Sequence, residues 1–210
     1  MEADILKNLV KNINRYKAHK KSKDNEIVYE TLLAHTELTN KYFIKFWQSK
    51  NSDEIFDRFC NVFWQKENID NELKNKAKDL LKEIIMAIPI FHDMGKVNPN
   101  FQLMKLKVND FKENKAYVNT HHSFLSSMFY MDYCRKLIYD EKNEDNEENK
   151  DKIINLLSEF ILYNGYIIEL HHSKLKNMKK FKDDINVSLK KNGFFVKLKP
   201  YLNLLTKAYW

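Results

Sequence analysis

The scarcity of glycine and proline constrains the fold of this chain more than any other feature. Only three of each occur among its 210 residues, and these are the residues that most often end helices or form turns. The stretches between them are rich in leucine, isoleucine, lysine, glutamate and asparagine. Leucine, lysine and glutamate are good helix formers, so the sequence predicts an all-α fold.

Length and composition predict a single globular domain over residues 1–210. A chain of this length can bury a substantial core. Its hydrophobic share of 43% is typical of globular proteins and excludes disorder, although 31% of the residues are charged. The acidic stretch 140–151 is predicted to be a solvated surface loop.

Apolar residues recur at helical spacing in most of the chain. A polar, lysine-rich connection is expected over 17–25, and Pro89 is expected to interrupt the helical ladder just ahead of His92. The last segment, 194–210, alternates apolar and basic residues around a proline. Helices are expected over residues 5–16, 26–47, 53–64, 71–87, 121–138 and 153–170.

Cysteine usage and hydropathy indicate a cytoplasmic protein with no membrane segment. Cys60 and Cys134 are far apart and belong to no CxxC motif, so two buried free thiols are expected. No stretch approaches the roughly 18 consecutive apolar residues of a membrane helix. The formal charge of +7 favours polyanionic partners, but only weakly, since lysine-rich proteins are often basic without binding nucleic acid.

Residues 91–96 (FHDMGK) carry the strongest chemical signal. A histidine beside a carboxylate binds first-row divalent metals well, and the two oxygens of Asp93 can bridge two ions while His92 serves one. Gly95 permits close backbone approach or a left-handed turn, and Lys96 places a positive charge where a phosphate could bind. The alternative is a turn glycine followed by a surface lysine.

Other histidines can be grouped with this pair. His35 lies inside an expected helix, whereas His19 is an outlier in a basic stretch. Of the adjacent residues 121 and 122, one is expected to be a spectator. The pair at 171 and 172 follows an apolar helix, and successive helical residues point about 100° apart, so both can bind one ion only at a helix end. The set predicts a metal centre.

Three segments resemble one known family. Residues 92–102 (HDMGKVNPNFQ) look like the HD-x-GK-x-NP-x-FQ signature of the HD nuclease domain of the CRISPR-associated type I interference nuclease-helicase, in the HD phosphohydrolase superfamily. Residues 122–127 are similar to that family's histidine segment ending in a small pair. Residues 168–172 (IELHH) are similar to its double-histidine motif. The resemblance spans roughly residues 27 to 175.

The resemblance implies an all-α HD-fold nuclease that cuts single-stranded DNA with two divalent transition-metal ions, typically Mn, Ni, Co or Fe. It implies that Asp93 bridges the ions and that Lys96 neutralises a phosphate oxygen. Asn98, Phe101 and Gln102 would shape the path of the DNA strand. The first ion would be held by His35, His92 and Asp93, and the second by Asp93, His122, His171 and His172.

The resemblance also implies partners and exposes one departure. A helicase module, fused or separate, and a CRISPR RNA-guided surveillance complex are expected, although no GxxxxGK[ST] phosphate loop occurs here. The family's pattern ends with an aspartate on a C-terminal helix, and Asp183 and Asp184 follow the double histidine too soon to be assigned to it. The chain is therefore expected to be a piece of a longer nuclease-helicase.

Two other functions fit parts of the pattern. An HD phosphohydrolase acting on nucleotides or cyclic dinucleotides shares HD-x-GK, but the NPNFQ continuation and the lack of a GYP tripeptide favour the nuclease. An inactive remnant that binds DNA or a partner is favoured by the missing aspartate.

Overall fold

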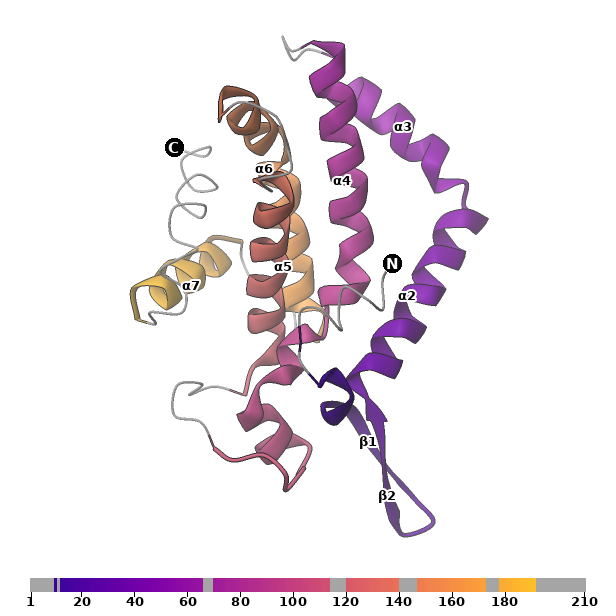
Figure 1. Ribbon diagram of the computed structural model, residues 1–210, viewed down its shortest axis with the longest axis vertical. Helices are drawn as coiled ribbons and strands as arrows, with labels where there is room; N and C mark the ends of the chain where they lie inside the picture. The colour runs from indigo at the N-terminus through magenta and orange to yellow at the C-terminus, as the bar shows by residue number, and fades with distance from the viewer. Residues whose placement is uncertain are drawn as a thin grey trace.

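The computed structural model describes residues 10, 12–65, 70–113, 120–139, 147–172 and 178–191. These residues form a helical fold with one small antiparallel sheet, which confirms the predicted fold class (Figure 1). The strands are β1 (Lys17–Lys23) and β2 (Glu26–Thr31), and the short helices are η1 (Ile13–Arg15), η2 (Met94–Val97) and η3 (Phe101–Lys105). The longer helices are α2 (Leu32–Ser49), α3 (Ser52–Phe63), α4 (Asn71–Phe91), α5 (His122–Ile138), α6 (Glu147–Leu170) and α7 (Met178–Lys191).

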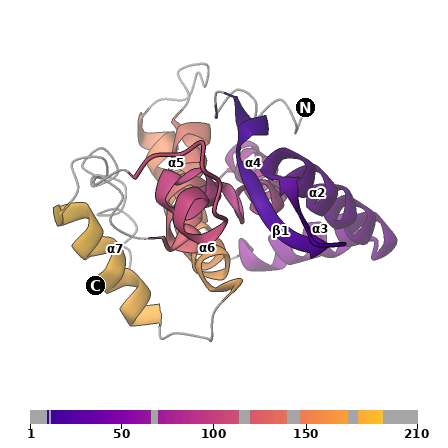
Figure 2. The ribbon, with the colours of Figure 1, turned by 90° about the horizontal axis from the view of Figure 1, so that it is seen from below.

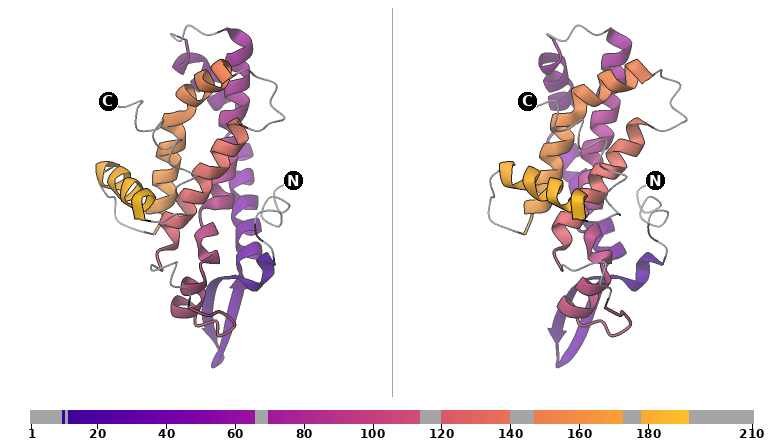
Figure 3. Two further views of the ribbon diagram at one scale, coloured as in Figure 1. Left: turned by 60° about the vertical axis from the view of Figure 1, so that its left-hand side comes forward. Right: turned by 90° about the vertical axis from the view of Figure 1, so that its left-hand side faces the viewer.

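Helices α4, α5 and α6 pack against one another along the long axis of the molecule, and α2 packs on α4 (Figure 1). Helix α7 lies across the outside of this bundle (Figure 3), where Phe181 contacts Tyr166 of α6 with ring centroids 5.5 Å apart. The hydrophobic core includes both cysteines, Cys60 and Cys134, which are buried free thiols as predicted. Burial of these apolar faces is the main force that holds the helices together.

Two helices begin at residues whose side chains cap them. The Thr31 hydroxyl accepts a hydrogen bond from the Ala34 amide at 3.2 Å, and the Asp70 carboxylate accepts one from the Leu73 amide at 2.7 Å. Each bond satisfies one of the free amides at a helix start. The cap at Thr31 fixes the point at which β2 gives way to α2.

The region 17–31 differs from the sequence prediction. The expected connection over 17–25 and the first residues of the expected helix 26–47 form the β1–β2 hairpin instead. Asp24 and Asn25 both have positive φ, at 51° and 67°, which is the requirement of a tight two-residue hairpin turn. Side chains such as Ile27, Val28 and Thr31 favour strands, and this preference outweighs the helical spacing.

Other expected boundaries are partly right. The helices expected at 53–64, 121–138 and 153–170 are confirmed. Helix α4 continues through Pro89 to Phe91, so the proline does not end it. The acidic stretch is not wholly a loop, since α6 begins at Glu147. The expected helix 5–16 is wrong at its end, which is η1 followed by β1, while its first residues and the segment 194–210 lie outside the described residues.

One helix in the described part of the chain is long and apolar enough to cross a membrane. Residues Asp151–Leu170 of α6 meet that criterion, and 56% of this window is buried inside the protein. Because α6 packs against both α4 and α5, its apolar sequence is explained by its place in the core of the bundle.

Candidate metal centre

The residues that the sequence marks for metal and phosphate chemistry come from several elements. They lie at the start of α2, the end of α4 and η2, the start of α5 and the turn after α6. These points meet at the lower end of the bundle in Figure 1, and Figure 2 views the molecule from that end. The residues at these points are His35, His92, Asp93, Lys96, His122, His171 and His172.

Asp93 Oδ2 belongs to a first group of three ligand atoms. It lies 3.1 Å from Nε2 of His35 and 3.4 Å from Nε2 of His92, and the two nitrogens are 3.3 Å apart. Metal–ligand bonds of about 2.0–2.2 Å at tetrahedral angles place ligand atoms roughly 3.3–3.6 Å apart. The three separations of 3.1, 3.4 and 3.3 Å are close to this spacing, so the three atoms could share a single divalent ion.

Asp93 Oδ1 faces a second group. Nε2 of His122 and Nε2 of His171 each lie 3.1 Å from it, and Nε2 of His172 lies 3.8 Å away. The His122 nitrogen is buried and, within the described part of the chain, has the charge contact with Oδ1 but no hydrogen-bond partner. A buried nitrogen left without a partner is costly, and a cation would satisfy it.

The backbone fixes which nitrogen of two histidines is available. Nδ1 of His92 donates to the carbonyl of Pro89 at 2.7 Å, and Nδ1 of His171 donates to the carbonyl of Ile168 at 2.6 Å. In a neutral imidazole the other nitrogen, Nε2, then carries a lone pair. Both lone pairs point at oxygens of Asp93, an arrangement that requires a proton or a metal ion between them.

Asp93 is 1% exposed and remains ionised. Burial alone would raise the pKa of this carboxyl, but contacts with three imidazoles and the charge of Lys96 outweigh burial and hold the pKa well below its ordinary value. The three imidazoles are those of His122, His171 and His35. The group thus offers a full negative charge to a cation at any physiological pH.

The pKa of His35 is shifted in the opposite direction to the pKa values of His92, His122 and His172. Contact with Asp93 raises the pKa of His35, although burial acts in the opposite direction. Burial lowers the pKa of His92 and of His122. Burial, together with the neighbouring imidazole, lowers the pKa of His172 to about 4.

These directions predict that, with an ion in each group, the two groups lose metal at different pH. Only the neutral imidazole binds metal, and His35 is the ligand whose raised pKa favours the protonated form. Lowering the pH from about 8 to about 5 should therefore release the ion of the first group before that of the second. Equilibrium dialysis against Mn²⁺, followed by metal analysis at each pH, measures this order. Simultaneous loss of both ions, or earlier loss of the second, would contradict it.

Gly95 allows the backbone of η2 to approach the start of α5 closely. A Cβ at this position would lie 1.9 Å from the His122 carbonyl oxygen, and the Gly95 amide donates to the Ser126 hydroxyl at 2.8 Å. Its φ is not positive. Of the two roles expected for this glycine, the structure thus shows the close approach, which brings α5 onto the Asp93 turn.

Three buried residues that follow Lys96 pack or form hydrogen bonds beside the centre. The Gln102 side chain donates to the carbonyls of Lys17 at 2.8 Å and Lys96 at 2.6 Å, and accepts from the Lys17 amide at 3.0 Å. Gln102, Asn98 and Phe101 are all buried, and Phe101 packs on a ligand imidazole. Gln102 thereby ties β1 to η2, and the expectation that these three residues shape the path of a DNA strand stays a prediction.

Two residues beside the centre were not identified from the sequence. Glu30 Oε2 lies 3.2 Å from Nδ1 of His35, and the ring centroid of His19 lies 4.6 Å from that of His35. A sequence prediction of two strands joined by a turn at Asp24-Asn25 would have placed His19 opposite Glu30. His121, by contrast, precedes α5 and belongs to no ligand group found among the described residues, and neither do Asp183 and Asp184.

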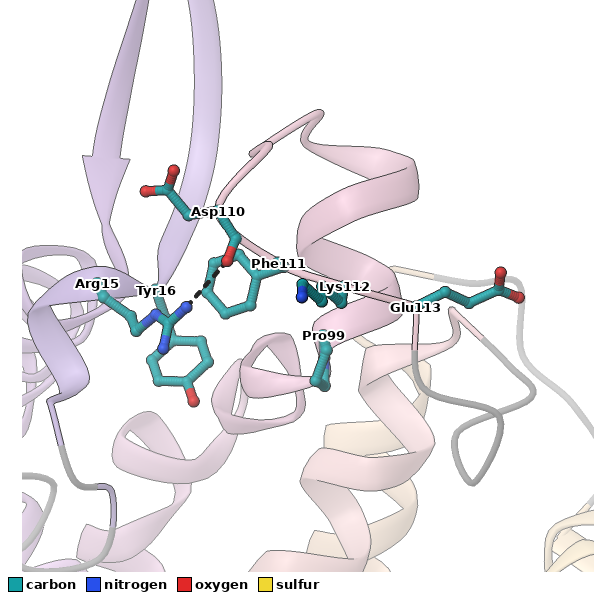
Figure 4. Close-up of a pocket in the computed structure, with 7 residues that line it drawn as sticks. All are labelled: Arg15, Tyr16, Pro99, Asp110, Phe111, Lys112 and Glu113. Atoms are coloured by element: carbon teal, nitrogen blue, oxygen red, sulfur yellow. Dashed lines mark hydrogen bonds between the residues drawn. The ribbon is translucent and has the colours of Figure 1, made fainter.

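A separate open pocket of about 490 Å³ lies between the base of the hairpin and the segment after η3 (Figure 4). The Arg15 guanidinium lies 4.5 Å from the ring centre of Phe111 and donates to the carbonyl of Asp110 at 3.1 Å. No residue that lines this pocket belongs to the ligand groups. The lining residues are Arg15, Tyr16, Pro99, Asp110, Phe111, Lys112 and Glu113.

The comparison with protein families agrees with the geometry. The model described as "Cas3, HD domain" matches residues 17–191, which is most of the chain. The chain belongs to the Cas3 HD-domain family. No curated protein and no solved structure matches it.

Membership confirms the family that the three sequence segments resemble, and it implies a metal-dependent nuclease of CRISPR defence. The His/Asp groups around Asp93 give this Cas3 HD domain the means to hold divalent metal. Sequence and structure thus agree on the class of protein and the class of cofactor.

Proposed function

We propose that this Cas3 HD domain hydrolyses phosphodiester bonds of single-stranded DNA with two divalent transition-metal ions. The observation that supports it best is that the two oxygens of Asp93 face different histidines. Oδ2 faces one pair of histidines, and Oδ1 faces three others. A carboxylate that bridges two ions is typical of hydrolytic sites for phosphate esters.

The donor set favours transition metals over magnesium. Imidazole nitrogens outnumber carboxylates in both ligand groups, and imidazole suits Mn, Ni, Co or Fe better than it suits magnesium. Such a pair of ions, when bound, would stabilise the attacking and leaving oxygens of the phosphodiester. The ligands proposed are His35, His92 and Asp93 for one ion and Asp93, His122, His171 and His172 for the other.

Lys96 is proposed to add positive charge at the position of the phosphate. Its ammonium group lies 2.8 Å from Asp93 Oδ2, and the residue is only 2% exposed. A buried charge requires a partner, so Lys96, together with the three imidazoles, keeps Asp93 ionised in the resting protein. In the complex it would also neutralise a non-bridging phosphate oxygen.

The substrate and partners are inferred from family and charge. Lys20, Lys21 and Lys23 are exposed on β1 of the hairpin that contacts the centre, and lysines bind the phosphates of a single strand without reading its sequence. A helicase module and an RNA-guided surveillance complex would deliver the unwound strand. We place the protein in the cytoplasm, where buried free thiols such as Cys60 and Cys134 persist.

The test is cleavage by the purified chain of three substrates: end-labelled single-stranded DNA, the matching duplex, and free nucleotides. We expect Mn²⁺ or Ni²⁺ to stimulate cleavage of the single strand only, and chelation to stop it. Release of phosphate from nucleotides or opening of cyclic dinucleotides, with DNA left intact, would replace this proposal by that of a nucleotide phosphohydrolase. A chain that retains no transition metal and cuts nothing in added Mn²⁺ would be a binding remnant.

A further inference from the structure

The β1–β2 hairpin presents two ionisable side chains to one ligand of the centre. His19 and Glu30 are directly opposite each other in the strand register, so their side chains lie on the same face of the hairpin. Both contact His35: Glu30 through Oε2 to Nδ1 at 3.2 Å, and His19 through an edge-on ring contact. Glu30 stands just before Thr31, which caps the helix that carries His35.

The same kind of contact recurs at other histidines of the centre. Nδ1 of His92 and Nδ1 of His171 each have a backbone carbonyl as partner, which leaves Nε2 to face Asp93. His35 also faces Asp93 with Nε2, but its Nδ1 meets a side chain, Glu30, in place of a carbonyl. Histidines that bind metal through one nitrogen usually donate from the other to a carboxylate or carbonyl.

His19, Glu30 and His35 are close enough to form a ligand group of their own. One ligand atom from each of these side chains lies within 4.8 Å of the other two. A separate cation there would need a lone pair on Nδ1 of His35. A neutral imidazole carries only one lone pair, and the contacts of Nε2 with His92 and Asp93 place that lone pair in the first ligand group. The carboxylate is therefore placed to accept from Nδ1–H of His35.

We propose that Glu30 is a positioning residue for the first ion. Its carboxylate lies 3.2 Å from Nδ1 of His35. With metal bound it would accept a hydrogen bond from Nδ1–H, and this bond would hold the ring and the tautomer that directs Nε2 into the group with His92 and Asp93. This inference rests on the proposed metal site. The hairpin is suited to the task because it is tied to the frame of the centre, through Gln102 at Lys17 and through the Tyr29 hydroxyl, which donates to the Leu106 carbonyl at 3.1 Å.

The experiment compares Mn²⁺ binding by the full chain and three variants in the same titration. Glu30→Ala should weaken one of the two ions by about 10- to 100-fold, as is usual when the carboxylate partner of a ligand histidine is removed, and leave the other ion unchanged. Glu30→Gln should recover most of the affinity, because its amide oxygen still accepts from Nδ1–H. Glu26→Ala is the matched control, since Glu26 is an exposed carboxylate of the same strand, and should bind as the unaltered chain does.

Three results would each decide against the inference. Normal binding in Glu30→Ala would show that the contact has no role. Equal loss in Glu30→Gln and Glu30→Ala would make Glu30 a direct ligand, because an amide is a much poorer ligand than a carboxylate. Nitrogen-15 NMR of the zinc-loaded chain that finds no proton on Nδ1 of His35 would exclude the hydrogen bond. If the unaltered chain binds no Mn²⁺, the proposed metal site itself fails, which is a different outcome.

Discussion

In the proposed two-ion nuclease, replacing Asp93 by alanine should remove both metal ions and reduce DNA cleavage to the background level. Each oxygen of this carboxylate serves a different ligand group, so a single substitution breaks both. The variants His35→Ala and His171→Ala, which each alter one group only, should each lose one ion and keep the other. Metal analysis after dialysis should thus find two tightly bound ions per chain in the unaltered protein. It should find none in Asp93→Ala and one in each of the two histidine variants.

Folding must be checked in this variant because Asp93→Ala leaves Lys96 buried without its carboxylate. Breaking a buried ion pair costs about 3–5 kcal/mol. Asp93→Asn keeps the shape of the side chain and one oxygen that accepts from Lys96, so it should fold and still cut nothing. Two ions retained by folded Asp93→Asn, together with normal cleavage, would show that this carboxylate is not the bridge.

The sequence predicted much of the centre because histidine and aspartate are chemically conspicuous. Helical periodicity placed α5 and α6 and thereby put His122 at a helix start and His171 at a helix end. The pairing of those residues with Asp93 could not be derived from spacing, since it depends on how the bundle closes. It came from the family resemblance.

The hairpin could not be recognised from periodicity. Apolar residues at Ile27, Leu32 and Leu33 fit one helical face, whereas the switch from strand to helix depends on the Thr31 cap and the two positive φ angles of the Asp-Asn turn. These are local backbone features that apolar spacing does not report. The position of Glu30 beside His35 was missed for this reason.

Gly95→Ala should disrupt the centre without removing any ligand side chain. The added methyl group would sit 1.9 Å from the His122 carbonyl oxygen and 2.8 Å from the Ser126 amide nitrogen. Both are backbone atoms of α5, so the methyl group fits only if the whole helix moves away from η2. We expect a loss of about 1–3 kcal/mol in the free energy of unfolding, as is usual for overpacking, and a second ion that binds weakly because His122 has moved from Asp93.

Gly165→Ala supplies the control, because Gly165 lies in the interior of α6 and its Cβ would meet side-chain atoms at 3.2–3.4 Å. The gain of about 0.5–1 kcal/mol in helix propensity should offset these tight contacts, so stability should change by less than about 1 kcal/mol. Urea denaturation and Mn²⁺ titration of the two variants make the comparison. Equal stability and equal metal binding in both would mean that the contact between η2 and α5 does not position the second group.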